Sequence, residues 1–120
     1  MTTGSTTTPA GTLTIRVKLG STIVLATGVL TAVSGIVNRA FDIQFIITCR
    51  TAGAPGTVFA QGTVLRSTGD NTSARWEMVN TSTTGVITTG ALALNVTAQW
   101  GTAHASNTIT ATNTLINVLN

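Results

Sequence analysis

The chain has 120 residues, enough for one domain with one hydrophobic core. Only 8% of its residues are charged and 42% are hydrophobic, which excludes a disordered chain. The net charge of +3 comes from six basic residues that are spread along the sequence without a basic run, which argues against a nucleic-acid partner. A surface with so few charges repels itself little and suits permanent association with copies of itself or with a lattice.

The N-terminal stretch, residues 1–11, consists mainly of Thr, Ser and Gly, which predicts a flexible arm in front of one domain over residues 12–120. It has neither the basic start nor the apolar centre of a secretion signal. An arm of this composition becomes ordered only by resting on another surface, such as a neighbouring subunit. The residues expected to make that contact are Thr6, Thr7, Thr8 and Pro9.

From residue 12 onward, alternation of apolar and polar residues predicts strands. The first is TLTIRVKL (12–19), and a short second strand follows in STIVLATG (21–28). The uncharged stretch 19–38 has the length of a membrane span, but its Gly, Ser and Thr residues favour two strands and a turn. We therefore expect no membrane partner.

The next predicted hairpin pairs FDIQFIITCR (41–50) with TVFAQGTVLR (57–66) across the turn TAGAPG. Cys49 continues the apolar phase of the first strand, so we expect a small buried side chain. Gly62 lies inside the second strand and indicates a bulge or close packing.

The second half of the chain shows the same pattern. Residues 67–73 have the composition of a loop. ARWEMVN (74–80) predicts a strand, and VITTG (86–90) predicts a short strand or the end of one. ALALNVTAQW (91–100) predicts a strand with Leu92, Leu94, Val96, Ala98 and Trp100 on one face. NTITATNTLINVL (107–119) predicts the last strand. Seven or eight strands without a long helix predict an antiparallel sandwich or barrel.

The chain carries three carboxylates, one histidine and one cysteine. Asp42 lies within a strand, Asp70 in a turn and Glu77 beside Trp76, and nothing in the sequence brings two of them to one cleft, as a glycosidase requires. A single histidine without nearby ligand spacing is not a zinc site, and no phosphate-binding glycine pattern occurs. We expect neither enzyme activity nor a cofactor or metal.

Residues 94–110, LNVTAQWGTAHASNTIT, contain Trp100 and the only histidine, His104. Trp100 is in phase with Leu94, so we expect it to pack in the core, whereas His104 lies in a loop of small residues. The loop residues expected to form a binding surface are His104, Asp70 and Asn71.

The same segment carries a resemblance to a known family. VTAQWGTAHASNTIT, together with TLTIRVKLGST, NRAFDIQFIITCRTAGAPGTVFAQG and MVNT, resembles a jelly-roll module of tailed-bacteriophage head-fibre, decoration and tail-appendage proteins. It covers the chain from about residue 12 to the end. In that family a small residue usually stands at the position of His104, which argues against a catalytic histidine.

The resemblance implies an antiparallel jelly-roll β-sandwich of about eight strands, a homotrimer on the virion surface, and no catalysis. Because the module stands here behind a short arm, we expect a capsid decoration (cement) protein. Such a protein would bind the major capsid protein and stabilise the shell through contacts that only the assembled capsid offers. The alternative is a receptor-binding fibre tip that binds a host surface glycan through its loops.

Overall fold

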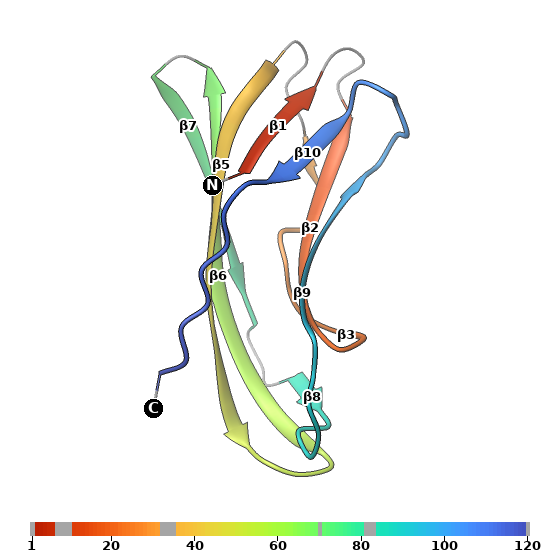
Figure 1. Cartoon of the computed structure of the whole chain (residues 1–120), viewed down its shortest axis with the longest axis vertical. Coiled ribbons are helices and arrows are strands. Elements are labelled where there is room, and N and C mark those ends of the chain that lie inside the picture. The colour runs from red at the N-terminus through yellow and green to blue at the C-terminus, as the bar shows by residue number, and fades with distance from the viewer. Residues whose placement is uncertain (1, 7–10, 32–35, 70, 81–83, 120) are drawn as a thin grey trace.

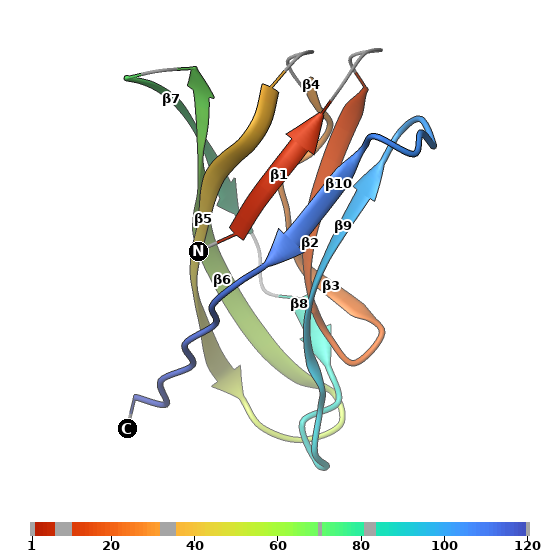
Figure 2. The same cartoon turned by 45° about the horizontal axis from the view of Figure 1, so that its top comes forward.

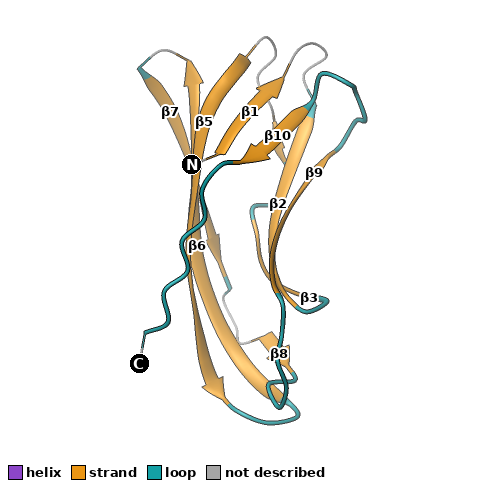
Figure 3. Cartoon of the chain, in the orientation of Figure 1, coloured by secondary structure: helices purple, strands orange, loops and turns teal. Residues whose placement is uncertain are grey.

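The computed structural model describes residues 2–6, 11–31, 36–69, 71–80 and 84–119. These residues form strands, turns and loops without a helix (Figure 3), so the predicted all-β fold is confirmed. No helix in these ranges is long and apolar enough to cross a membrane. The strands are β1 (Thr2–Thr6), β2 (Thr12–Leu19), β3 (Thr22–Ala26), β4 (Leu30–Thr31), β5 (Ile36–Thr51), β6 (Gly56–Gly69), β7 (Thr72–Val79), β8 (Thr84–Val86), β9 (Leu94–Trp100) and β10 (Thr108–Ala111).

The strands form two antiparallel sheets that face each other across one core (Figures 1 and 2). The larger sheet has the order β10-β1-β5-β6-β7, and β8 also pairs with β6. In the smaller sheet β2 is central, with β9 on one side and β3 and β4 on the other. The buried residues that form the core are Leu13, Ile15, Val17, Val24, Leu25, Val58, Ala60, Val64, Met78 and Val86.

The first predicted strands are confirmed in the smaller sheet. In β2, apolar side chains at alternate positions are buried and the side chains between them are partly exposed. β3 instead buries two consecutive residues, Val24 and Leu25. Its pairing with β2 shifts between Val17 and Lys18, and the extra residue in this bulge lets both side chains reach the core.

The hairpin of β5 and β6 is also confirmed, and Gly62 lies opposite Phe45 within it. A Cβ atom on Gly62 would stand 2.6 Å from the Gln44 carbonyl oxygen and 2.7 Å from the Phe45 Cβ. The pairing register is continuous at this residue. Gly62 therefore permits close packing and does not mark a bulge.

The prediction of a buried Cys49 is wrong, because its side chain is exposed. Its partner in the hairpin, Val58, is buried. β1 pairs with β5 only as far as Phe41, so the later part of β5 has β6 on one side and no described strand on the other. An apolar phase therefore does not ensure burial at Cys49.

The predicted loop over residues 67–73 is also wrong, because β6 and β7 continue to a tight turn. The hydroxyl groups of Thr68 and Thr72 lie 3.1 Å apart across the hairpin. Asn71 has a φ of 59°, a left-handed conformation that asparagine tolerates better than most residues. Asp70 lies outside the described residues.

The first and last strands, β1 and β10, pair with each other in the larger sheet. Residues Thr2–Thr6 of the predicted arm form β1, which pairs with β10 on one side and with β5 on the other. Thr7, Thr8 and Pro9 lie outside the described residues. The last predicted strand is shorter than expected, because β10 ends at Ala111 and residues 112–119 follow it as a loop.

Candidate functional site

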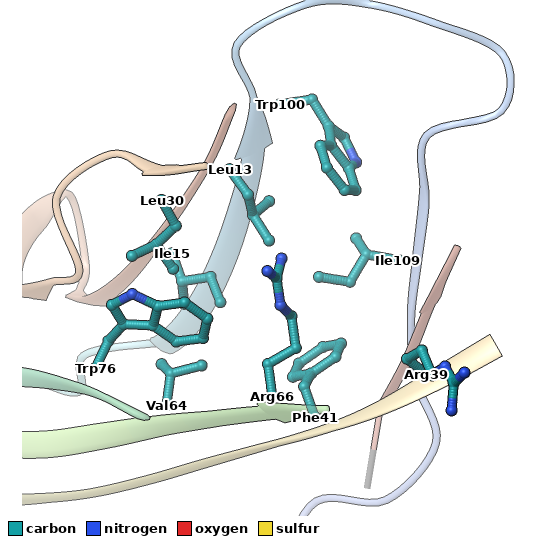
Figure 4. A pocket seen from close by; sticks show the side chains of 10 residues that line it. All are labelled: Leu13, Ile15, Leu30, Arg39, Phe41, Val64, Arg66, Trp76, Trp100 and Ile109. Atoms are coloured by element: carbon teal, nitrogen blue, oxygen red, sulfur yellow. The ribbon is translucent and has the colours of Figure 1, made fainter. Parts of the chain in front are cut away.

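A small cavity lies between the two sheets and is lined by residues of both (Figure 4). It contains about 30 Å³, and most of its lining is aliphatic or aromatic. Two tryptophans, Trp76 of β7 and Trp100 of β9, and two arginines, Arg39 of β5 and Arg66 of β6, contribute to its wall. Both tryptophans pack against the core, as predicted from their phase.

Arg66 extends from β6 into the middle of this cavity, beside Trp76 (Figure 4). Its guanidinium carbon lies 5.1 Å from the centre of the Trp76 ring, within the range of a cation–π interaction. Its Nη2 donates to the carbonyl oxygen of Thr31 at 3.4 Å, whereas its Nε is buried without a hydrogen-bond partner among the described residues. Burial lowers the pKa of Arg66, because desolvation penalises the charged form.

The size of the cavity limits what it can bind. A water molecule needs roughly 10–15 Å³ of such space, whereas pockets for small molecules usually contain about 300–1,000 Å³. The cavity therefore suits about two or three water molecules beside the Arg66 guanidinium and is too small for a sugar ring.

A second, open hollow lies along β5, β6 and the turn before β7. It contains about 340 Å³, and Asp42, Ser67, Asn71, Thr72 and Ser73 supply its polar lining. The Asp42 carboxylate accepts a hydrogen bond from the Gln44 side-chain amide at 2.8 Å. This hollow contains one of the predicted surface-binding residues, Asn71.

His104 is exposed in the loop between β9 and β10. Its Nδ1 accepts a hydrogen bond from the Ser106 backbone N–H at 3.1 Å, and its carbonyl oxygen accepts one from the Asn107 backbone N–H at 3.0 Å. Figures 1 and 2 show this loop, which joins β9 of the smaller sheet to β10 of the larger sheet, on the opposite side of the molecule from the turn that joins β6 to β7. The structure therefore does not bring His104 and Asn71 together.

The described carboxylates do not share a cleft. Asp42 lies on β5 and Glu77 on β7, with β6 between them, and both are exposed. Glu77 is 4.0 Å from Arg75 on its own strand. No group of three His, Cys, Asp or Glu side chains within the described ranges could hold a metal ion.

The C-terminal third forms a surface of a different kind. Residues 78–120 contain no Asp, Glu, Lys or Arg, yet they include β9, β10 and the loop after β10. In that loop, which we call the C-terminal segment (residues 112–119), the exposed fractions of four large aliphatic side chains range from 65% to 84%. They are Leu115, Ile116, Val118 and Leu119.

The predicted inward face of β9 is buried only at its ends. Leu94 and Trp100 pack against the core, but Val96 and Ala98 are exposed, which corrects the sequence prediction. The reason is that β9 pairs with β2 alone among the described strands. Arg66 was not among the predicted site residues, although its period-two phase with Val64 indicated that it points inward.

The chain has no significant match among protein-family models, curated proteins or solved structures. Its function is therefore inferred from its residues and their geometry. The geometry provides a small cavity that holds an arginine, an open polar hollow beside Asn71, and an uncharged C-terminal third with exposed aliphatic side chains.

Proposed function

We propose that the chain is a structural virion protein, a capsid decoration (cement) protein that binds the outer surface of a phage shell as a homotrimer. The observation that carries this proposal is the uncharged C-terminal third with its exposed aliphatic segment. Apolar surface of this kind marks sites of association, and the lack of charge keeps the desolvation cost of a permanent contact low. The resemblance of residues 94–110 to phage virion modules supplies the proposed assembly.

The strand pairing supports a jelly-roll topology in part. The first and last strands, β1 and β10, pair in the larger sheet, and the next two inward, β2 and β9, pair in the smaller sheet. Nested pairs that alternate between two sheets are a feature of jelly rolls. The consecutive pairing of β5, β6 and β7 departs from a regular jelly roll.

Cryo-electron microscopy of virions produced with and without this chain tests the proposal. A decoration protein is expected as many copies at symmetric positions on the head, and shells that carry it should withstand higher temperature than shells that lack it. Shells of equal stability and no density for the chain on the head would contradict the proposal. Deleting residues 2–10 is not a clean test of shell binding, because β1 lies between β5 and β10.

A second candidate function is binding of a host surface glycan, and the open hollow beside Asn71 favours it. Its hydroxyl, amide and carboxylate groups are those that hydrogen-bond sugars, and the partly exposed Leu65 adds an apolar contact. Titration of host-derived polysaccharide against the chain tests this function. Asp42→Asn should weaken binding at least about tenfold, since it removes a charged acceptor at nearly constant shape.

Asn71→Gly provides the companion variant, because glycine adopts the left-handed conformation of residue 71 without strain. It removes the amide while keeping the turn, so weaker glycan binding would assign the amide a direct contact. Glycan affinity unchanged in both variants would exclude the hollow as the binding site.

A further inference from the structure

The free edge of β9 has the properties of a docking site for a strand. β9 pairs with β2 over all seven of its residues, and no other described strand pairs with it. On its inward face, Val96 is 48% exposed although its partner in β2, Val17, is fully buried. An added strand would complete the backbone pairing of β9 and cover Val96.

The β9 edge of the smaller sheet differs in charge from the β7 edge of the larger sheet. Exposed sheet edges are usually protected by charged side chains that prevent further pairing. β7, which ends the larger sheet, carries exposed Arg75 and Glu77. β9 carries no charge. The two cations on β2, Arg16 and Lys18, lie on the face opposite Val96, where Arg16 donates to Gln99 at 2.7 Å. The β9 edge thus lacks the usual protection.

The same chain contains a segment suited to this edge. The C-terminal segment is uncharged, and its large aliphatic residues fall on both faces of an extended chain, Leu115 and Leu119 on one and Ile116 and Val118 on the other. Eight extended residues span about 26 Å, close to the roughly 23 Å of a seven-residue strand such as β9. A strand that is apolar on both faces is stable only when both are covered.

The segment and the β9 edge do not meet within one chain. Figures 1 and 2 show the segment leaving β10 and running away from β9, toward the opposite side of the molecule. Each copy therefore carries an extended apolar segment and, apart from it, an unpaired strand edge. Contacts between unlike surfaces of identical chains close into rings when the rotation permits.

We propose that residues 112–119 of one copy add as a strand to the β9 edge of a second copy, and that this exchange closes a ring of copies. This inference rests on the self-association that the proposed function includes and names the surfaces that produce it. The occupant of the β9 edge is thus a second copy of this chain.

Light scattering of full-length variants after size-exclusion chromatography tests this exchange. The donor variant carries Leu115→Lys and Leu119→Lys, and the acceptor variant carries Val96→Lys. All three positions are exposed in the single chain, so each variant should fold and give an unchanged circular dichroism spectrum.

The unmodified chain should form a ring, and each variant should self-associate at least about tenfold more weakly. The matched control is Val29→Lys, which should still form the ring. Val29 is 72% exposed and directly precedes β4, which lies across β2 from β9.

Mixing the two variants gives the decisive measurement. The donor variant keeps an intact β9 edge and the acceptor variant keeps an intact C-terminal segment, so the mixture should form a one-to-one dimer that neither variant forms alone. A monomeric unmodified chain, variants that still form the ring, or a mixture that stays monomeric would each overturn the exchange.

The outcome separates the exchange from the proposed function. A chain that forms the ring through these surfaces but is absent from the virion head would leave the exchange standing and remove the decoration role. A chain that decorates the head while both variants still form rings would support the decoration role and remove the exchange.

Discussion

Val17 and Val96 lie opposite each other in the pairing of β2 with β9, yet Val17 is 0% exposed and Val96 is 48% exposed. Side chains of paired residues lie on the same face of a sheet, so both point toward the inner side. β2 has neighbours on both sides, whereas β9 has one among the described strands. Position within the sheet, and not residue type, sets the burial of these two valines.

This difference predicts unequal costs for the same substitution. Val17→Ala should lower the free energy of unfolding by about 2 kcal/mol, because it leaves a cavity in a closed part of the core. Val96→Ala should lower it by less than about 0.5 kcal/mol, since its surroundings are open to water. Urea unfolding should be measured in a chain that also carries Leu115→Lys, so that self-association does not cover Val96. Equal losses from the two substitutions would contradict the open edge.

Alternation predicted β2 well, because this strand has neighbours on both sides and a facing sheet. The inward Trp76 and Met78 also follow period two, although their strand, β7, ends the larger sheet. The same rule failed at Cys49 and Val96, where one neighbouring strand is missing. Edge positions depend on contacts between distant segments, and periodicity carries no information about them.

The candidate site was less predictable than the fold. Turn composition placed Asn71 in a turn, and its left-handed backbone agrees with that placement. The sequence could not show that His104 lies in a loop on the opposite side of the molecule from Asn71. The pairing of β1 with β5 was also hidden, because a short Thr-rich segment has no hydrophobic period of its own. Its backbone partners in β5 lie 30 or more positions away along the chain.

Gly62 gives a second prediction, about close packing within the larger sheet. Gly62→Ala should lower the free energy of unfolding by about 2 kcal/mol, because the new Cβ meets the Gln44 carbonyl oxygen and the Phe45 Cβ. Gly85→Ala in β8 is the matched control, since no heavy atom lies within 4 Å of the Cβ position and φ is not left-handed there. Thermal unfolding should show a lower Tm for the first variant alone. A Tm for Gly62→Ala equal to that of Gly85→Ala would show that the hairpin adjusts to the extra methyl group.

Arg66 gives the third prediction, about the cavity between the sheets. Its stacking on Trp76 stabilises the fold by about 0.5–1 kcal/mol, whereas a buried donor without a partner costs about 1–3 kcal/mol. Arg66→Met keeps the long apolar stem and removes both the charge and the unpartnered Nε. The free energy of unfolding should therefore rise by about 1 kcal/mol in denaturant titrations at neutral pH.

Arg66→Ala separates packing from charge in the same experiment. It removes the stem as well as the guanidinium, so it should lower the free energy of unfolding by about 1–2 kcal/mol through lost contacts in the cavity. A loss of stability in Arg66→Met as large as in Arg66→Ala would show that the guanidinium stabilises the fold, through water in the cavity or through Trp76. Met at this position would then lack the one group that the surrounding tryptophans and the Thr31 carbonyl are arranged to hold.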